Sequence, residues 1–201
     1  MRVAVLAPLL LGGCAMDVKE TLKRYTGTPD GASVEDRPDM TQPLGDVHLR
    51  VGVFASQEVR ERACTLLGCR IEHGQQLMGE VEAQFRRVFD VVTPVYKFPP
   101  PRQDAEGIDV VIVVEAPELE SAPAADREHR VRFRCGFCVC TISGARIDPV
   151  TEEAACRAVL KATSAPANEG AVRDGVTAVV RGAVYGFLRR APSIMNKRYD
   201  K

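Results

Sequence analysis

Residues 171–188, AVRDGVTAVVRGAVYGFL, decide the fold class because they combine one apolar stripe with a polar opposite side. Apolar side chains recur three or four positions apart, which is the spacing of residues on one face of an α-helix. We expect Asn168, just upstream, to cap the N-terminus of this helix. A helix with one apolar face must pack against another layer of structure. The stripe comprises Val172, Val176, Val179, Val180, Ala183, Val184, Phe187 and Leu188.

Two further helices are predicted nearer the N-terminus. The stronger pattern lies within residues 77–89, where apolar residues again recur at helical spacing. A shorter helix is expected over residues 56–67, with Ser56 as its N-cap and Gly68 as its end. The apolar side of the stronger helix consists of Leu77, Met78, Val81, Phe85, Val88 and Phe89.

Five segments carry patterns typical of β-strands. Residues 108–114 are apolar at both alternating sets of positions, which indicates a central strand covered on two sides. The last two strands are expected to form a hairpin with its turn around Asp148-Pro149. The five segments are residues 47–54, 91–96, 108–114, 131–141 and 154–162.

This order of elements predicts an α/β, or α+β, two-layer sandwich. Its sheet would be mixed and about five-stranded, with the two amphipathic helices on one face. The other face of the sheet would then remain partly free. Residues 47–190 form the domain in this interpretation, and residues 191–201 form a C-terminal tail.

The N-terminus indicates export. Met1 and Arg2 precede an apolar run over residues 3–11, which is too short to span a bilayer, since a spanning helix needs about 20 apolar residues. A basic start, a short apolar run and small residues are typical of a secretory signal. A buried N-terminal element with an incidental thiol is the alternative.

Leu11-Gly12-Gly13-Cys14 resembles the bacterial lipobox. The resemblance implies removal of a signal peptide, residues 1–13, and attachment of a membrane-anchoring lipid to Cys14. Gly12 departs from the usual Ala or Ser, and Arg2 is the only basic residue before the run. Ala15 follows the cysteine, and by similarity to enteric lipoproteins this implies the periplasmic face of the outer membrane rather than the inner membrane.

Residues 14–46 are interpreted as a lipid-anchored flexible tether, because they are polar beyond the anchor and lack apolar periodicity. For the second half of this segment, irregular contacts with the domain are the alternative.

The charge balance excludes one class of function. The 201 residues carry 27 basic and 27 acidic side chains, whereas a protein that binds nucleic acid through phosphate contacts normally has a basic excess. No cofactor other than the covalent lipid on Cys14 is indicated.

Six of the seven cysteines remain once Cys14 is assigned to the lipid, and an even number permits disulfides in an oxidising compartment. Cys64 and Cys69 are the candidates for a local bridge. A cross-link from their loop to Cys138 or Cys140 is the rival pairing.

Strand alternation sorts the residues of the segment 131–141. Cys135 should face the helices, and so should Cys156 on the neighbouring strand, whereas Cys138 and Cys140 should share the opposite face. The Cα atoms of Cys138 and Cys140 would lie about 6.6 Å apart, so the two thiols should not bond each other unless the strand is bulged. Three arginines extend the same outer face as a candidate surface for a partner or an anion: Arg130, Arg132 and Arg134.

The element order resembles the small α/β domains of bacterial envelope lipoproteins of the curli-secretion, Pel-export and transporter-associated types. Four short matches carry this resemblance: Gly74, Phe89-Asp90-Val91-Val92, Asp109-Val110-Val111 and Asp148-Pro149-Val150-Thr151. The resemblance implies a role in envelope assembly or transport.

The leading hypothesis is therefore a membrane-anchored periplasmic lipoprotein that binds or assembles envelope components and has no catalytic activity. Its expected partners are the membrane, through the lipid, and an envelope protein or further copies of itself. One alternative is a thiol-dependent redox or metal-binding protein that uses Cys135, Cys138 and Cys140. The other is a lipid- or glycan-binding module, which an open apolar groove between helix and sheet would favour.

Overall fold

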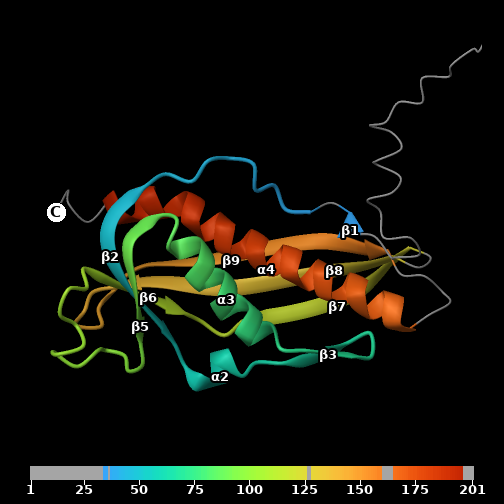
Figure 1. Cartoon of the computed structure of the whole chain (residues 1–201), viewed down its shortest axis with the longest axis horizontal. Helices are drawn as coiled ribbons and strands as arrows, with labels where there is room; N and C mark the ends of the chain where they lie inside the picture. Colours follow the sequence, from blue (N-terminus) through green and yellow to red (C-terminus); the bar gives the residue numbers. More distant parts are fainter. Residues whose placement is uncertain (1–33, 36, 126–127, 160–164, 197–201) are drawn as a thin grey trace, which may run out of the picture.

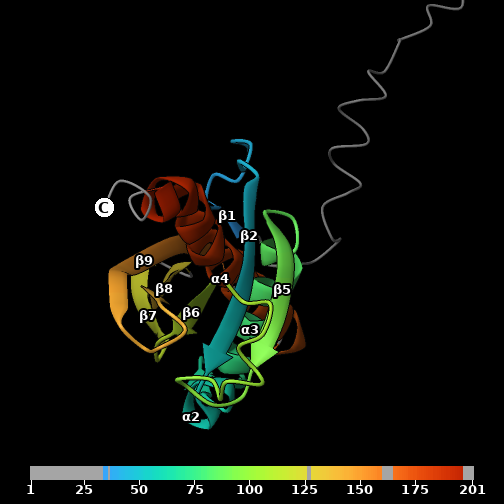
Figure 2. The same ribbon diagram turned by 90° about the vertical axis from the view of Figure 1, so that its left-hand side faces the viewer.

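A mixed sheet with two long helices on one face forms the body of the protein (Figures 1 and 2). The computed structural model describes residues 34–35, 37–125, 128–159 and 165–196. Within them, the helices α3 (His73–Phe85) and α4 (Ala165–Asn196) cover the sheet. The predicted two-layer α/β sandwich is confirmed, and the sheet has seven strands rather than about five.

The strands follow the order β1-β9-β8-β6-β2-β5, and β7 pairs with the part of β8 that β6 leaves open. Strand β2 runs parallel to both β5 and β6, whereas the other pairs are antiparallel. The sheet strands are β1 (Val34–Glu35), β2 (Val47–Ala55), β5 (Phe89–Val95), β6 (Val110–Val114), β7 (Glu118–Ala125), β8 (Glu128–Cys140) and β9 (Arg146–Val159).

The main core lies between the helices and the sheet. Phe137 of β8 stacks on Phe187 of α4 with ring centroids 4.6 Å apart, and Phe85 of α3 lies 5.7 Å from Phe187. All three rings are fully buried. One aromatic cluster therefore joins both helices to the centre of the sheet.

The outer face of the sheet is not free along its whole length. Ile108 and Phe98, from the segment between β5 and β6, pack with Val95 and Val111 in a second, smaller core. The expectation of a partly open face therefore holds only for the part of the sheet built from β7, β8 and β9.

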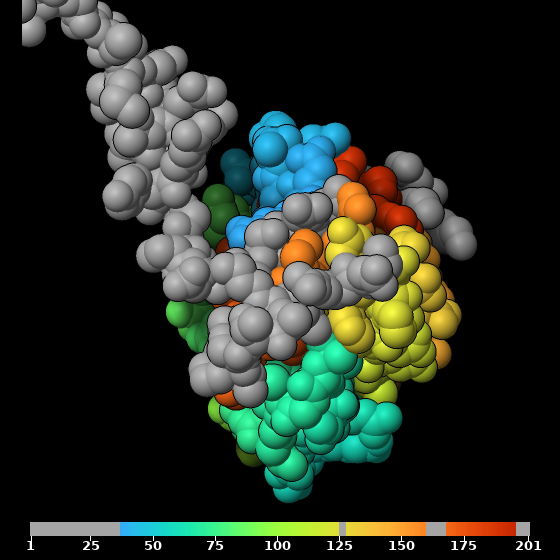
Figure 3. Space-filling view, turned by 90° about the vertical axis from the view of Figure 1, so that its right-hand side faces the viewer, coloured from blue at the N-terminus to red at the C-terminus, as the bar shows by residue number. Residues whose placement is uncertain are grey.

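The expected helix over residues 56–67 is mostly wrong. Ser56 is the N-cap, because its hydroxyl accepts a hydrogen bond from Val59 N at 3.3 Å, but α2 (Gln57–Arg60) has only four residues. The chain then forms a hairpin of β3 (Cys64–Leu66) and β4 (Cys69–Ile71), which lies at one end of the molecule (Figure 3). Leu67 and Gly68 have φ angles of 50° and 82°, as a two-residue type I′ turn requires.

The expected turn at Asp148-Pro149 is also wrong, because both residues lie inside β9. The chain reverses instead over residues 141–145, where Thr141 N donates to Ala145 O at 2.8 Å and Gly144 adopts a φ of 92°. A proline is tolerated in β9 because the far edge of that strand pairs with β1 only at Arg157 and Ala158 among the described residues.

Strand β7 was not predicted from the sequence. It carries Pro123 and few apolar residues, so its alternation is weak. It forms because the first half of β8 would otherwise leave a long hydrogen-bonding edge unpaired.

The segment assigned to the tether contributes to the domain in its second half. Strand β1 pairs with β9, and the hydroxyl of Tyr185 in α4 donates to the carbonyl of Gln42. Pro38 lies against Gly182 of the same helix. The first part of the predicted tether, residues 14–33, lies outside the described residues, as does the predicted signal peptide.

The domain also continues beyond residue 190, contrary to the prediction of a tail from residue 191. Helix α4 extends to Asn196, because Ala191, Ile194 and Met195 continue its buried side. Asn168, expected to be the N-cap, lies within the helix, which begins at Ala165. In the described part of the chain, no helix combines the length and the apolar character needed to cross a bilayer.

Gly74 allows α3 to pack directly on the backbone of α2. A Cβ atom at residue 74 would overlap the carbonyl oxygen of Val59 and lie 2.9 Å from that of Arg60. Neither oxygen can move easily, since both belong to the backbone. Gly79, further along α3, has open space instead, with no atom within 4 Å of the point where a Cβ would lie.

We expect Gly74→Ala to lower the free energy of unfolding by about 2–3 kcal/mol, because the added methyl group forces α2 and α3 apart. Gly79→Ala is the matched control, and it should raise the stability by up to about 1 kcal/mol because alanine favours the helix. Urea denaturation followed by circular dichroism measures both. A Gly74→Ala variant as stable as the wild type would contradict the packing described.

Glu152 is a buried carboxylate in β9, only 6% exposed. Its side chain lies over Gly186 of α4 and faces Arg190, with 3.2 Å between Oε1 and Nε. Burial raises the pKa of Glu152 above its usual value, although Arg190 and Arg189 act in the opposite direction. The folded protein therefore binds a proton at Glu152 more tightly than the unfolded chain does.

This shift predicts that stability falls as the pH rises from about 4.5 through the folded-state pKa of Glu152, because ionisation is disfavoured in the fold. Glu152→Gln resembles the protonated form and should remove this part of the pH dependence. Glu153→Gln controls for the loss of one negative charge on the exposed side of the same strand. Denaturation midpoints measured across this pH range test the prediction. The same pH dependence of the midpoint in the wild type and in Glu152→Gln would refute it.

Candidate functional site

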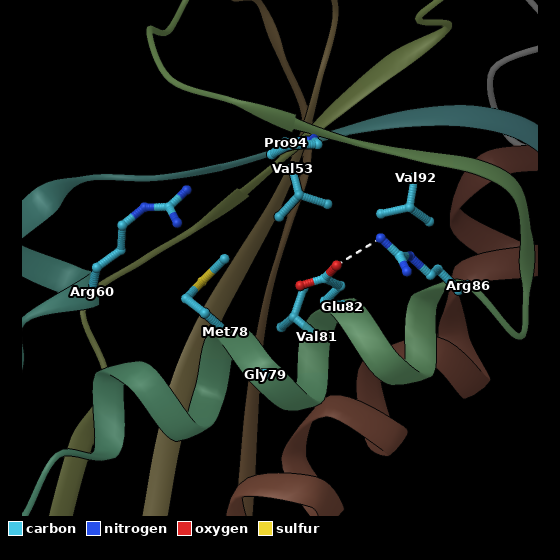
Figure 4. Close-up of a pocket in the computed structure, with 9 residues that line it drawn as sticks. All are labelled: Val53, Arg60, Met78, Gly79, Val81, Glu82, Arg86, Val92 and Pro94. Carbon is cyan, nitrogen blue, oxygen red and sulfur yellow. Dashed lines mark hydrogen bonds and ion pairs between the residues drawn. The ribbon is translucent and has the colours of Figure 1, made fainter.

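An open groove of about 200 Å³ lies between α3 and the strands β2 and β5 (Figure 4). Its floor is mainly apolar, and three charged side chains border it. The lining residues are Val53, Arg60, Met78, Gly79, Val81, Glu82, Arg86, Val92 and Pro94.

The groove arises from the position of α3 over the edge of the sheet. Leu77, Val81 and Phe85 face the core, and this turns the neighbouring Met78 and Glu82 toward β2 and β5. In the described residues β5 pairs only with β2, so it is an edge strand. Among those residues, no further element fills the space between this edge and the helix.

Two arginines lie at opposite ends of the apolar floor, on either side of Val53 and Met78 (Figure 4). Arg86 Nη2 lies 2.6 Å from Glu82 Oε1 in an i,i+4 ion pair. Arg60 donates from Nε to the carbonyl of Ala55 at 3.1 Å, and no carboxylate in the described part of the chain pairs with it. The groove therefore offers an apolar surface with a cation that can receive an anionic group.

Only part of this site could be recognised in the sequence. Met78 belongs to the predicted apolar stripe of its helix together with Leu77. Two adjacent apolar residues point in different directions from a helix, so this stripe is wider than packing on the sheet alone requires. Nothing in the sequence indicated that Arg60 borders a groove beside α3. The chain between Arg60 and α3 forms the β3–β4 hairpin, which was not predicted, so their proximity could not be foreseen.

The predicted arginine face is present but carries acidic partners. Arg132 Nε lies 3.0 Å from Glu153 Oε1 on β9, and Arg134 Nη1 lies 3.9 Å from Glu118 Oε2 on β7. The cross-strand register places four arginines and four glutamates on this surface: Arg130, Arg132, Arg134, Arg157, Glu118, Glu120, Glu128 and Glu153.

This outer surface is therefore electrically balanced rather than basic. The acidic side chains on β7 were missed because that strand was not predicted. Exposed ion pairs of this kind contribute little to stability, since both groups remain hydrated. Use of Arg130, Arg132 and Arg134 as an anion or partner surface stays a prediction, and the balance of charge disfavours an anion.

Cys64 and Cys69 lie on the β3–β4 hairpin as free, half-buried thiols. Cys64 is paired with Ile71 and Cys69 with Leu66, so the two cysteines are diagonal rather than opposite. Diagonal neighbours are about 7–8 Å apart, whereas a disulfide needs Cβ atoms about 3.8 Å apart. A bridge here stays a prediction that would require the hairpin register to change.

The strand cysteines do not converge on one point. Cys135 and Cys156 pack in the core on the helix side, as predicted, and Cys138 lies on the outer side with Cys140. Burial, together with the charge of Glu115, raises the pKa of Cys135 to about 12. This shift is opposite to the lowered pKa that thiol redox catalysis uses. Among the described residues, no group of three or more cysteine, histidine or acidic side chains is arranged to hold a metal ion.

Cys14, the predicted lipidation site, lies outside the described residues. Comparison with known proteins bears on the class of protein instead. No protein-family model matches the sequence, and no curated protein matches it in sequence either.

Several solved structures share the fold. A minor lipoprotein from Acinetobacter baumannii superposes with a TM-score of 0.51 at 12% identity, covering 77% of this chain and 96% of that one. Lipoprotein B from Nitrosomonas europaea gives a TM-score of 0.51 at 14% identity over 79% and 91% of the two chains. A DUF330 protein from Xanthomonas campestris gives 0.50 at 13% identity over 83% and 97%.

The protein thus has the fold of small bacterial lipoproteins, in agreement with the predicted resemblance. At these identities the likeness concerns the fold alone.

Proposed function

We propose that this protein is a membrane-anchored lipoprotein of the bacterial envelope that binds or assembles other envelope components and performs no catalysis. The observation that carries the proposal is the lipobox-like Leu11-Gly12-Gly13-Cys14 ahead of a domain with a lipoprotein fold. Each buried methylene of an attached acyl chain contributes about 0.8 kcal/mol to membrane binding, so two or more chains give a durable anchor. Ala15 supports the outer membrane, with the domain on its periplasmic face.

The absence of catalysis in this proposal rests on the thiols. Cys135 is buried with a raised pKa, and its sulfur points away from those of Cys138 and Cys140. The groove beside α3 instead has the character of a binding surface.

The anchor is tested by replacing Cys14 with Ser in the full-length chain. We expect the wild type to incorporate labelled palmitate and to accumulate as a precursor when globomycin is added. Cys14→Ser should lose both properties, because the thiol that receives the lipid is missing. Cys69→Ser, which removes a half-buried thiol from the domain, should behave as the wild type does. A wild-type chain that takes up no label would overturn the proposed anchor.

A second candidate function is favoured by the groove itself. Its apolar floor suits an acyl chain better than a glycan, and Arg60 is placed to receive an anionic group at one end. We therefore propose that the groove binds the acyl chain of an anionic amphiphile.

Filling the groove tests this second function. Gly79→Leu should reduce the affinity for a dansyl-labelled fatty acid at least about tenfold, because the new side chain occupies the groove. Gly170→Leu is the matched control: residue 170 is also a helical glycine with nothing within 4 Å of its Cβ position, but it lies outside the groove. Arg60→Gln should weaken binding through loss of the cation. Equal fluorescence titrations for wild type and Gly79→Leu would exclude the groove.

A further inference from the structure

Two thiols meet on the outer face of the sheet near the end of β8. The sulfur atoms of Cys138 and Cys140 lie 3.6 Å apart. Both residues are almost completely buried, with 0% and 1% of their surface exposed. The two cysteines are separated by a single residue, Val139, whose side chain points to the opposite face.

A register irregularity in the neighbouring strand lies beside this contact. Val139 pairs with Asp148 of β9, but Cys140 pairs with Arg146, so Ile147 is an extra residue in β9. Such a bulge bends a strand pair and increases its twist. In a regular strand the two cysteines would lie about 6.6 Å apart at Cα with parallel side chains. The extra residue belongs to β9, whereas β8 keeps an unbroken register with β6 across both cysteines, so the two sulfur atoms meet because their side chains turn toward each other.

The surroundings hold the two thiols together. Cys138 lies opposite Val113 and Cys140 opposite Val111 on β6. Beyond them, the turn at Gly144 lies against Pro99 of the segment between β5 and β6. Burial and the hydrogen bond to Cys138 raise the pKa of Cys140 to about 12. Because both cysteines are buried, a protein oxidase can reach them only while the chain folds or opens locally.

We propose that Cys138 and Cys140 are joined by an intrastrand disulfide in the exported protein. This inference rests on the proposed envelope location, because disulfides persist in oxidising compartments. The pair also differs from Cys135 and Cys156, which are separated from it by the sheet.

The reaction is a thiol–disulfide exchange with a protein disulfide oxidase. The thiolate of one cysteine attacks a sulfur of the oxidase disulfide, which gives a mixed disulfide and releases one oxidase thiolate. The thiolate of the second cysteine then attacks the first cysteine's sulfur, forms the Cys138–Cys140 bond and releases the other oxidase sulfur. The cysteine pair loses two electrons, the oxidase disulfide gains them, and the two protons lost by the pair are balanced by those taken up by the oxidase thiols.

A single peptide reports the outcome. Cleavage after Arg134 and Arg146 by trypsin releases residues 135–146, which contain Cys135, Cys138 and Cys140. The full-length lipoprotein is isolated from membranes, denatured in N-ethylmaleimide and digested. We expect one alkylated thiol in this peptide before reduction and three after it, with fragmentation placing the bond between Cys138 and Cys140.

Two variants assign the bond independently of its measured mass. Cys138→Ser should leave Cys140 open to alkylation, whereas Cys135→Ser should retain the disulfide. Circular dichroism checks that both variants are folded. A bond from Cys135 to either partner, or three alkylated thiols in the wild type together with a confirmed lipid anchor, would overturn the inference.

Refolding separates this inference from the proposed location. The full-length chain is reduced, unfolded and refolded in detergent with oxidised glutathione as the disulfide donor. Closure of the Cys138–Cys140 bond supports the geometry wherever the protein resides in the cell. Failure to close, in protein with a lipidated Cys14, defeats the disulfide and leaves the proposed function standing. A third outcome is that the bond closes on refolding in vitro, whereas protein isolated from cells is unlipidated and has free thiols. That outcome would contradict the proposed location and, with it, the disulfide in the cell.

Discussion

The packing of α4 on the long β8–β9 hairpin is the constraint on which the rest of the structure depends. Gly182 and Gly186 let the helix approach closely: a Cβ atom at residue 182 would lie 3.1 Å from the Cβ of Ala154, and one at residue 186 would overlap the carboxylate of Glu152. Each large apolar side chain buried in this contact contributes about 1.5–3 kcal/mol. Because α4 occupies the β8–β9 side of the sheet, α3 packs over the β2–β5 side, and the groove lies at that margin.

Elements with strong periodicity could be predicted from the sequence, and those decided by tertiary contacts could not. The stripes of α3 and α4, and the alternation of β2 and β8, each reflect one buried face, so local pattern and fold agree. The segment 56–67 contains apolar residues at helical spacing, yet its backbone follows the type I′ turn at Leu67-Gly68. Strand β7 has almost no pattern of its own and exists because β8 is longer than β6.

The candidate site shows the same division. The face on which Arg130, Arg132 and Arg134 lie follows from alternation, but their electrostatic environment depends on strands that pair from both sides. A row of arginines in one strand predicts a basic surface only if the neighbouring strands are neutral, and here both neighbours supply glutamates. The groove beside α3 shows the opposite case, because Arg60 reaches it from a different element and has no acidic partner among the described residues.

The contact between Cys138 and Cys140 lies within β8, beside a register irregularity in the neighbouring strand β9. Strand alternation places both thiols on the outer face. In a regular strand their side chains would be parallel and their Cα atoms about 6.6 Å apart. Strand β9 has one residue more than β8 at this point, so the pair must bend where the turn at residues 141–145 begins. The turn at Gly144 lies against Pro99 of the segment between β5 and β6, and both cysteines are almost completely buried. Because both cysteines are almost completely buried, the fold would protect a bond between them from reduction once it had formed.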